Sequence, residues 1–378
     1  MVGVFYFCTM IEYIVVGLGL AGIAFCEELE ATGKEFVVFE DNSQKSSTVA
    51  GGLYNPVILK RFTLSWNANE QLEVALPFYE ALEEKLQTHF DEKITVKRRF
   101  ASVEEQNLWF EASDKPKLSR YLDTDLITNK NEAVNASYAL GKVKETGRVF
   151  TERLLKAYRE YLQQKHSFRN ERFHYEKLVI TENSVRYDNL QAKHIIFCEG
   201  FGIKQNPYFS YLPLNGTKGE LLYIKAPQLK IDYVLKSSVF LIPQGNDIYT
   251  VGATYNWEDK THLPTEKAKK ELKEKLSNLI QCDYEIINQV AGIRPTVADR
   301  RPLVGTHPKH MQLAVLNGLG TRGVMIGPTV AKQLYNHLTH QTALPDEINI
   351  KRFEKRYRKS VAKALDEQRR AQHSHREK

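Results

Sequence analysis

The sequence predicts an α/β fold in which a parallel-sheet domain is assembled from separated segments and joined to a second domain with a mixed β-sheet. Three observations predict it. Residues 13–40 read as an apolar strand, a glycine turn, a helix and a second apolar strand. Similar strand-and-turn patterns return much later, near Gly200 and over 318–323. Between them, from Leu212 onward, short β-type segments dominate, as expected of an inserted domain.

The opening segment has the spacing of a dinucleotide-binding motif. The strand over 13–16 leads into Gly17, Gly19 and Gly22, and the strand over 36–39 ends on Glu40. These glycines allow a tight turn, close approach of the backbone to a pyrophosphate, and close packing of helix on strand. Glu40 stands where an acceptor for ribose hydroxyls is expected, and a carboxylate there disfavours the 2′-phosphate of NADP. The segment therefore predicts a Rossmann-like nucleotide-binding domain.

The other elements follow from hydrophobic periodicity. Apolar residues at three- and four-residue spacing predict helices over 70–88, 150–164, 265–280 and 329–338. Short apolar runs predict strands over 94–96, 100–103, 178–180, 185–187, 194–197, 220–224, 239–242, 249–251 and 312–316. We assign 10–88, 143–212 and 292–345 to the nucleotide domain, 89–142 and 213–291 to an α+β substrate domain, and 346–378 to a basic C-terminal helix and tail.

The composition is that of a globular protein. The chain has 378 residues, of which 42% are hydrophobic and 26% charged, and no apolar run is long enough to span a membrane. The four cysteines form no CxxC pair and no metal-ligand spacing is present, so we expect a cytoplasmic protein without a metal site. Residues 1–9 lack the basic region and cleavage site of a signal peptide, and Met10 is the expected start.

The positive charge is confined to the C-terminal segment. Residues 351–378 hold 11 Lys/Arg against 4 Asp/Glu, which accounts for the whole net charge of +7. Apolar residues recur there at helical spacing and predict a helix docked on the body: Ile350, Phe353, Tyr357, Val361 and Leu365. A solvated helix with a frayed basic end is the favoured interpretation, and a nucleic-acid contact remains the alternative.

These motifs, in this order, resemble those of the FAD-dependent D-amino-acid oxidase (DAO) superfamily, and most of all its glycine oxidase and sarcosine oxidase branch. The resemblance runs from about residue 11 to 353 and includes the segments 39–40, 50–52, 218–221, 251–254, 291–295, 299–305 and 318–324. It implies a Rossmann-like FAD-binding domain and oxidation of a C–N bond by hydride transfer to flavin N5, giving an imine that hydrolyses. Relatives with covalent flavin carry a cysteine near the segment matched by 291–295. None stands there, so non-covalent FAD is expected.

The resemblance also implies the cofactor contacts. The fingerprint glycines would hold the pyrophosphate and Glu40 the adenosine ribose, while Leu178 would offer backbone groups to the adenine. The remaining expected contacts are Ser46, Ser47, Ala50, Gly51, Gly52, Gly200, Gly318, Leu319, Gly320, Thr321, Arg322, Gly323 and Val324. The backbone of 318–324 would lie at the pyrimidine edge, because a reduced flavin is anionic there and helix-terminal N–H groups stabilise anions.

Arg294 is the residue that the resemblance assigns to the substrate carboxylate, as a bidentate pair that fixes the α-carbon against flavin N5. An ion pair between the two domains is the alternative for Arg294. Arg322 and the Lys60-Arg61 pair are further candidates for the same cavity, although the pair also suits a solvated loop. No catalytic group is expected beyond the flavin.

Two departures from the family pattern concern the pocket. Phe240 stands where glycine oxidase-like enzymes place a tyrosine. Either Tyr249 or Tyr255 is a candidate to replace that hydroxyl, and a less polar substrate is the alternative. Some sarcosine oxidase-type enzymes carry a lysine that assists oxygen reduction, but the matching strand here offers Tyr249-Thr250. Oxidase and dehydrogenase activity therefore both remain open.

The leading hypothesis is an enzyme for a small carboxylate-bearing amine, either an amino acid or an N-substituted glycine. The segments 320–323 and 51–56 are also similar to the oxidase half of the bifunctional enzyme of tRNA wobble-uridine modification. That activity converts carboxymethylaminomethyl-uridine to aminomethyl-uridine, and the basic tail would then contact tRNA. A non-catalytic flavoprotein subunit is the third alternative.

Overall fold

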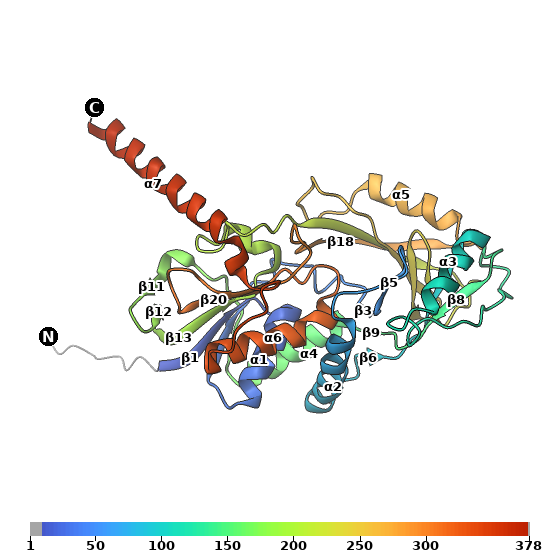
Figure 1. Cartoon of the computed structure of the whole chain (residues 1–378), viewed down its shortest axis with the longest axis horizontal. Helices are drawn as coiled ribbons and strands as arrows, with labels where there is room; N and C mark the ends of the chain where they lie inside the picture. The colour runs from blue at the N-terminus through green and yellow to red at the C-terminus, as the bar shows by residue number, and fades with distance from the viewer. Residues whose placement is uncertain (1–9, 377–378) are drawn as a thin grey trace.

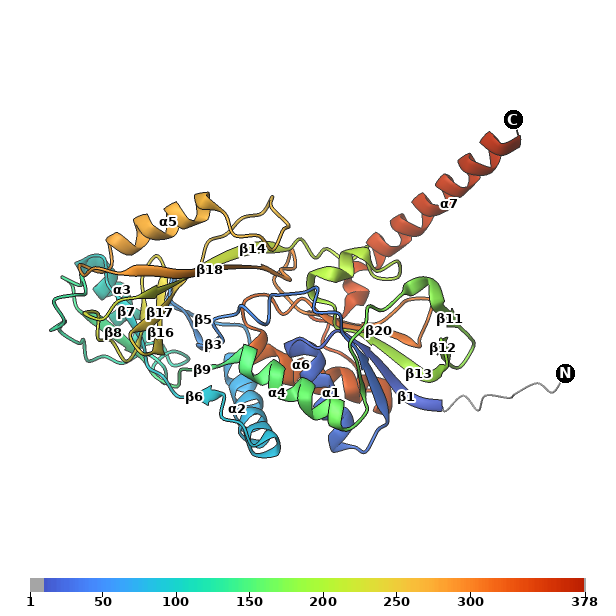
Figure 2. The ribbon, with the colours of Figure 1, turned by 180° about the vertical axis from the view of Figure 1, so that it is seen from behind.

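The structure is a computed structural model that describes the backbone of residues 10–376 and the side chains of 10–367, 369 and 370. The expectation for residues 1–9 falls outside the described residues. Figures 1 and 2 show two halves side by side, each built on its own sheet, with the helix at the C-terminal end projecting away from both.

Parallel strands form the centre of one half of the molecule. Across the sheet they follow the order β10 (Phe168–Arg169), β2 (Phe36–Phe39), β1 (Met10–Val16), β13 (Leu190–Phe197) and β20 (Leu313–Asn317). Antiparallel strands extend this sheet: β12 (Val185–Tyr187) beside the start of β13, then β11 (Leu178–Ile180), and β19 (Leu303–Thr306) beside β20. The parallel arrangement expected for the nucleotide domain is therefore present.

Both faces of this sheet are buried, because successive strand residues point to opposite sides. Tyr13 and Val15 of β1 pack in the cluster that includes the helices, whereas Ile14 and Val16 pack on the other face. The helical layer consists of α1 (Leu20–Ala31), α2 (Ala68–Leu86), α4 (Thr151–Gln164) and α6 (Gly323–His340) (Figure 1). Burial on both sides explains the continuous apolar run of β1.

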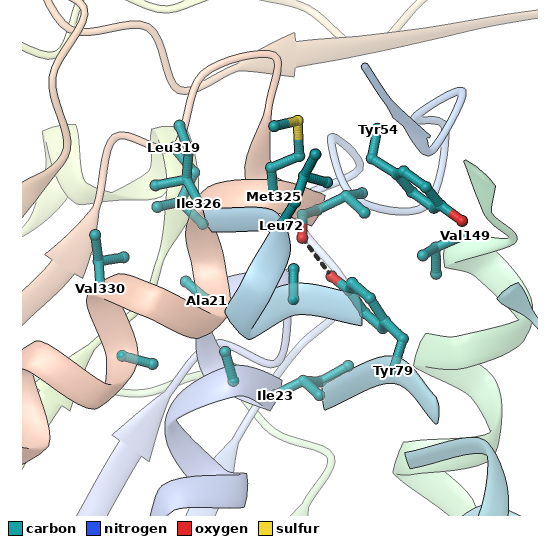
Figure 3. Close-up of a cluster of buried hydrophobic side chains, with 14 of the residues drawn as sticks. Ala21, Ile23, Tyr54, Leu72, Tyr79, Val149, Leu319, Met325, Ile326 and Val330 are labelled. Carbon is teal, nitrogen blue, oxygen red and sulfur yellow. Dashed lines mark hydrogen bonds between the residues drawn. The ribbon is translucent and has the colours of Figure 1, made fainter. Parts of the chain in front are cut away.

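Helices α1, α2 and α6 share one hydrophobic core (Figure 3). Ala21 and Ile23 of α1 lie there with Leu72 of α2 and Met325 of α6. The Tyr79 hydroxyl of α2 donates a hydrogen bond of 2.9 Å to the carbonyl oxygen of Val324, drawn as the dashed line in Figure 3. This bond ties α2 to the first turn of α6.

A mixed sheet forms the other half, as predicted. Its order is β18 (Glu285–Arg294), β14 (Thr217–Lys225), β17 (Ile248–Gly252), β16 (Phe240–Gly245), β15 (Val234–Lys236), β7 (Val96–Arg99) and β8 (Leu140–Val143). Neighbours are antiparallel except for β15 and β7. Helix α5 (Glu266–Ser277) covers its outer face, where Leu272 and Leu276 pack in the sheet's core (Figure 2). The predicted border between residues 291 and 292 falls inside β18.

Smaller elements connect the two sheets. Strands β3 (Leu53–Tyr54), β9 (Gly147–Val149) and β6 (Asp91–Glu92) form one small sheet, and β4 (Val57–Ile58) and β5 (Thr63–Leu64) form a hairpin. Short 3-10 turns are η1 (Tyr175–Lys177), η2 (Gly200–Gln205) and η3 (Ile350–Phe353). No helix among residues 10–376 combines the length and apolarity needed to cross a lipid bilayer.

Two predictions about elements need correction. Residues 100–103 do not form a strand, because Ser102 caps helix α3 (Val103–Ser113) with its hydroxyl accepting from the Glu105 N–H. The strand predicted over 94–96 overlaps β7 at Val96 alone.

The C-terminal helix α7 (Glu354–Arg376) docks over a shorter stretch than predicted. Ile350 is buried, Phe353 packs on the same cluster, and the Tyr357 ring lies 5.3 Å from Tyr211 and 5.2 Å from His307. Beyond Tyr357 the predicted apolar stripe is exposed, with Val361 at 40% and Leu365 at 50%. Figure 1 shows that α7 projects away from the body, so the docking prediction is wrong past Tyr357.

Candidate active site

A cavity of about 340 Å³ opens between the two sheets. Residues that follow β1, β2, β13 and β20 line one side, at the carboxyl ends of the parallel strands, and residues of β14, β15, β16 and β18 line the other. Ligands of open α/β sheets bind at the carboxyl ends of the strands. This cavity is therefore the candidate site.

Most of the residues predicted for cofactor and substrate line this cavity: Gly17, Gly19, Glu40, Ser46, Ser47, Ala50, Gly51, Gly52, Gly200, Phe240, Arg294, Leu319, Gly320, Thr321, Gly323 and Val324. Gly22, Leu178, Gly318, Arg61 and Arg322 are not among the lining residues. Leu178 is buried in β11, where it pairs with Tyr187.

Gly17 and Gly22 lie in contact at the turn between β1 and α1. Gly17 has a φ of +97°, and a Cβ on it would lie 2.6 Å from the Cys198 carbonyl oxygen. A Cβ on Gly22 would lie 2.1 Å from the Gly17 carbonyl oxygen. The turn therefore excludes any side chain at these positions, which brings the start of α1 against the end of β1.

Glu40 is held against the same turn. Its Oε2 accepts a hydrogen bond of 2.6 Å from the Leu18 N–H, and its Oε1 accepts one of 2.8 Å from the Asn42 N–H. Ser47 lies across the turn, where its Oγ accepts from the Leu20 N–H at 3.3 Å. The carboxylate and the first N–H groups of α1 thus share one side of the cavity.

Arg159 of α4 is a lining residue that the sequence analysis missed. Its Nη2 donates to Asn42 Oδ1, and its Nε is buried without a hydrogen-bond partner among the described residues. A buried guanidinium N–H without an acceptor is costly unless an anion satisfies it. A diphosphate lying along the glycine turn would do so. The turn, Glu40 and Arg159 therefore fit an FAD nucleotide.

A row of residues crosses the second sheet on the cavity side. Lys236 of β15 pairs with Phe240 of β16, which pairs with Gly252 of β17, which pairs with Leu221 of β14. Lys236, Phe240 and Leu221 line the cavity. The sequence analysis sought a lysine at Tyr249-Thr250 and missed Lys236, two strands away. Tyr249 is buried in the core of this sheet and does not line the cavity.

Lys236 is a half-buried cation. Desolvation, followed by the charges of Arg98 and Lys275, lowers its pKa from 10.5 to about 8. Its Nζ lies 5.6 Å from the centre of the Phe240 ring, and no ion pair to it is found among the described side chains. An uncompensated lysine beside an apolar ring gives this wall of the cavity a positive charge that titrates near neutral pH.

Arg294 ends β18 at the boundary between the two sheets. Its Nη1 donates to the Thr254 carbonyl oxygen at 3.2 Å, and its guanidinium lies 4.6 Å from the Tyr255 ring. Burial lowers the pKa of Arg294. No carboxylate partner of Arg294 is present among the described side chains, so the alternative of an interdomain ion pair finds no support there. The Arg294 guanidinium is thus oriented by the Thr254 carbonyl and the Tyr255 ring, and it has no acidic partner among the described side chains.

The segment that carries Tyr255 is fastened by a buried lysine. Lys218 has a fully buried side chain whose Nζ lies 2.5 Å from Asp259 Oδ2 and 3.2 Å from Thr261 Oγ1. The hydrogen bond from Lys218 is the main cause that lowers the pKa of Asp259 to about 2. Tyr255, rather than Tyr249, is thereby the tyrosine held at the cavity.

Arg322 and Arg61, predicted for the same cavity, are not among the residues that line it. Arg322 is the N-cap residue of α6 and is half-buried, while Arg61 is exposed in the turn between β4 and β5. Burial lowers the pKa of Arg322, the charges of Arg61 and Arg300 lower it further, and Tyr255 opposes the shift. Among the described residues, no three His, Cys, Asp or Glu side chains converge as a metal site.

Comparison with known proteins matches residues 12–336 to the family model "FAD dependent oxidoreductase" (DAO). The chain is 28% identical over 180 residues to the tRNA 5-methylaminomethyl-2-thiouridine biosynthesis bifunctional protein MnmC of Shewanella halifaxensis, covering 38% of this chain and 28% of that protein. It spans less than half the length of the MnmC proteins it matches.

Two solved structures share the fold. Glycine oxidase from Bacillus cereus superimposes with a TM-score of 0.71 at 17% identity, over 88% of this chain and 96% of that one. Iminodiacetate oxidase from Chelativorans sp. gives 0.73 at 16% identity, over 90% and 98%. The family match covers most of the chain and includes both sides of the cavity. The chain therefore belongs to the DAO family of FAD-dependent oxidoreductases.

Proposed function

We propose that this enzyme oxidises the C–N bond of a small amino acid or an N-substituted glycine. The observation that carries the proposal is Arg294, a half-buried guanidinium without an acidic partner among the described side chains, in the same cavity as the glycine turn and Glu40. The planar fork of a guanidinium matches a carboxylate in two parallel hydrogen bonds. The names of two structural neighbours, glycine oxidase and iminodiacetate oxidase, both specify carboxylate-bearing amines.

The residues of the cavity would orient such a substrate. Arg294 holds the carboxylate, and the Thr254 carbonyl keeps the guanidinium plane in place. Phe240 and Leu221 form an apolar wall on the same face of the sheet. When bound, FAD supplies the hydride acceptor for the carbon beside the amine nitrogen. Fixing the carboxylate therefore fixes the carbon that reacts.

Anaerobic bleaching of the flavin tests the proposal. Glycine, sarcosine or N-ethylglycine should reduce the flavin, whereas ethylamine, which lacks the carboxylate, should not. Reoxidation in air then separates an oxidase from a dehydrogenase. A flavin that no carboxylate-bearing amine bleaches would contradict the proposal and favour the non-catalytic alternative. Release of the flavin on acid precipitation would confirm the predicted non-covalent binding.

Substitution of Arg294 tests its role separately. Arg294→Ala should raise KM for the carboxylate substrate by about a hundredfold or more, because a charge-assisted bidentate pair is lost. Arg294→Lys should recover part of that loss. The flavin content of both variants should equal that of the wild type. An unchanged KM in Arg294→Ala would show that another group binds the carboxylate.

A second candidate uses the same chemistry on a larger substrate. The modified wobble uridine of tRNA carries an N-substituted glycine, and the curated relatives are named for the biosynthesis of a modified uridine in tRNA. The basic side chains of α7 are exposed, among them Lys355, Arg356, Lys359 and Lys363. An exposed basic helix supplies phosphate contacts whose affinity falls steeply with salt.

Binding of bulk tRNA distinguishes this candidate. It predicts binding that weakens with salt, is weaker in a chain ending at Arg358, which loses Lys359 and Lys363, and accompanies bleaching by tRNA that contains the carboxymethylated uridine. Truncation at Arg358 retains Tyr357, whose ring contacts Tyr211 of the body. Rapid turnover of free amino acids by a protein that neither binds tRNA nor is bleached by it would exclude the candidate.

A further inference from the structure

Two cationic side chains stand at opposite ends of one wall of the cavity. Lys236 ends β15 and Arg294 ends β18, and both residues line the cavity. The Arg294 guanidinium lies over Gly219 of β14, since a Cβ on that glycine would be 2.0 Å from Arg294 Nη2. Leu221 lies two residues farther along β14 and therefore points to the same face. The charged end of Arg294 is thus next to Leu221 on the cavity side of the sheet.

The wall between the two cations is apolar. Directly paired residues lead across the sheet from Leu221 to Gly252, then to Phe240 and to Lys236, so their side chains share one face. A Cβ on Gly252 would lie 2.1 Å from Leu221 Cδ2 and 2.8 Å from Phe240 Cζ, which shows that these two side chains close over the glycine. Leu221 and Phe240 therefore form an apolar floor that reaches from one cation to the other.

The apolar floor faces a segment expected to contact the flavin. Gly51 is one of the expected flavin contacts and lines the same cavity. A Cβ on Gly51 would lie 3.7 Å from Phe240 Cζ. A molecule lying on the floor is therefore close to the segment that would hold the flavin.

Lys236 has no partner for its charge among the described residues. Its Nζ makes neither a hydrogen bond nor an ion pair with them, and it lies 5.6 Å from the centre of the Phe240 ring. Arg98 is paired with Lys236 across β7 and β15, and it engages the nearby carboxylate of Glu105 through its Nε at 2.9 Å. A half-buried ammonium without an acceptor is costly unless a bound anion satisfies it. The apolar floor thus has a cation without a counter-charge at each end.

The distance between the two cations suits a small molecule. Lys236 Nζ lies over Phe240 of β16, and the Arg294 guanidinium lies over β14. Neighbouring strands are about 4.8 Å apart, so β16 and β14 are separated by about 10 Å across β17. An extended molecule with a carboxylate at each end can bridge a gap on the order of 10 Å while its carbon chain covers the apolar floor.

We propose that Lys236 binds a second carboxylate of the substrate, at the end remote from the carboxylate that Arg294 binds. The substrate is then an N-substituted glycine whose substituent ends in a carboxylate, and its carbon chain lies on Leu221 and Phe240. The inference rests on the proposed function of Arg294, and it narrows the substrate class from monoanionic to dianionic amines.

Matched pairs of ligands test the inference in the flavin-loaded enzyme. N-(carboxymethyl)glycine, N-(2-carboxyethyl)glycine and N-(3-carboxypropyl)glycine lengthen the substituent by one carbon at each step. N-ethylglycine, N-propylglycine and N-butylglycine have the same carbon numbers and lack the second carboxylate. The dissociation constant of each is measured from the concentration dependence of anaerobic flavin reduction. At the length that bridges the two cations, the dianion should bind at least about tenfold more tightly than its matched monoanion.

Substitution of Lys236 locates the effect. In Lys236→Met the ratio of the two dissociation constants should fall to about one, because the side chain keeps its length and loses its charge. Lys236→Arg should retain part of the preference for the dianion. Lys97→Met is the matched control, since it removes the same charge from the neighbouring strand β7, where Lys97 pairs with Leu235 on the opposite face of the sheet. The control should keep the ratio of the wild type.

A titration of the oxidised flavin gives a readout that does not depend on turnover. Adipate and hexanoate have the same chain length, and neither contains an amine that could be oxidised. Adipate should change the flavin absorbance at a concentration lower by about tenfold or more than hexanoate requires. This difference should disappear in Lys236→Met and persist in Lys97→Met, and the flavin content of each variant checks that it is folded.

The failures of the two proposals are distinguishable. If none of the ligands reduces the flavin, the proposed function fails, and the adipate titration still reports on Lys236. If every dianion binds no more tightly than its matched monoanion, the second carboxylate site is overturned while Arg294 keeps its role. A preference for dianions that persists in Lys236→Met would overturn the assignment to Lys236, because another group would then bind the second carboxylate.

Discussion

At the scale of single residues, the position of Arg294 depends on a glycine beneath it. Gly219 and Gly292 pair across β14 and β18, and a Cβ on Gly219 would lie 2.0 Å from Arg294 Nη2. The atom it would meet is the end of a flexible side chain, so the guanidinium can move away at little cost to the fold. A substitution at Gly219 should therefore change the position of the Arg294 guanidinium more than it changes the stability of the fold.

Gly219→Ala should displace Arg294 and raise KM for the carboxylate substrate by about tenfold or more, with wild-type flavin content and thermal stability. Steady-state kinetics and flavin absorbance check this. Gly327→Ala is the matched control, since a Cβ there would find its nearest neighbour at 3.6 Å, an ordinary contact. Equal KM values for the two variants would mean that Gly219 does not determine where Arg294 lies.

Lys236 gives the stability a pH dependence whose sign follows from its lowered pKa. Its pKa falls from 10.5 to about 8 on folding, so the unfolded chain binds more protons between these values and stability rises with pH there. Lys236→Met should therefore stabilise the flavin-free protein at pH 7 by on the order of 1–3 kcal/mol, and the gain should shrink toward pH 10.5. Urea unfolding at both pH values measures it; a gain that is independent of pH would contradict the burial of the charge.

Site residues could be predicted from the sequence only where their spacing along the chain defines a known motif. The glycine turn and Glu40 lie within one strand–helix–strand unit, so spacing alone placed them on one side of the cavity. Arg159 and Lys236 carry no such signal. Arg159 faces the cavity because of how α4 packs, and Lys236 faces it because of the register of β15 on β16, which are both tertiary properties.

At the scale of elements, helix α6 begins six residues before the predicted start because a distant side chain replaces a missing hydrogen bond. Pro328 lies inside the helix and has no N–H to donate to the Val324 carbonyl four residues earlier. Tyr79, which is 245 positions from Val324 in the chain, donates to that carbonyl instead (Figure 3). The periodicity of the local sequence does not include this contact between distant residues, so it could not predict that the helix continues through Pro328.

Tyr79→Phe should lower the free energy of unfolding by about 1–2 kcal/mol, because the Val324 carbonyl would then be buried without a donor. Tyr211→Phe is the control: the Tyr211 hydroxyl is buried with no hydrogen-bond partner among the described residues, so its removal should cost nothing. Denaturant unfolding compares the two. Equal effects would show that the Tyr79 hydroxyl contributes no specific bond to α6.

The error at 100–103 has a different origin, since its signal was present in the sequence. Ser102 and Glu105 have the spacing of a capping box, in which a hydroxyl and a carboxylate satisfy N–H groups at a helix start. In the structure Ser102 Oγ accepts from the Glu105 N–H, and Glu105 Oε2 accepts from the Ala101 N–H at 2.7 Å. The prediction relied on the apolar residues at 100 and 103 and therefore gave a strand. In the structure the capping interactions of Ser102 and Glu105 begin helix α3 instead.

At the scale of the whole molecule, charge and packing divide the chain at the same place. The segment 351–378 carries the entire net charge, and side-chain contact between α7 and the body reaches no farther than Tyr357 among the described side chains. Residues 358–367 of α7 are all exposed. The body that contains the cavity is thus neutral overall, and the basic helix extends from it (Figure 2).

This division predicts that the projecting part of α7 can be removed without affecting the body. A chain ending at Arg358 should keep the wild-type melting temperature, flavin content and KM for small amines, because it loses no buried apolar surface. Tyr357→Ala in the full chain should instead lower stability by about 1–2 kcal/mol, since it removes the ring that packs on Tyr211 and His307. Calorimetric melting and steady-state kinetics of the two variants check this. A truncated chain that melts lower than Tyr357→Ala would mean that α7 folds back on the body beyond Tyr357, and the basic helix would then be part of the catalytic body rather than an arm free to contact a partner.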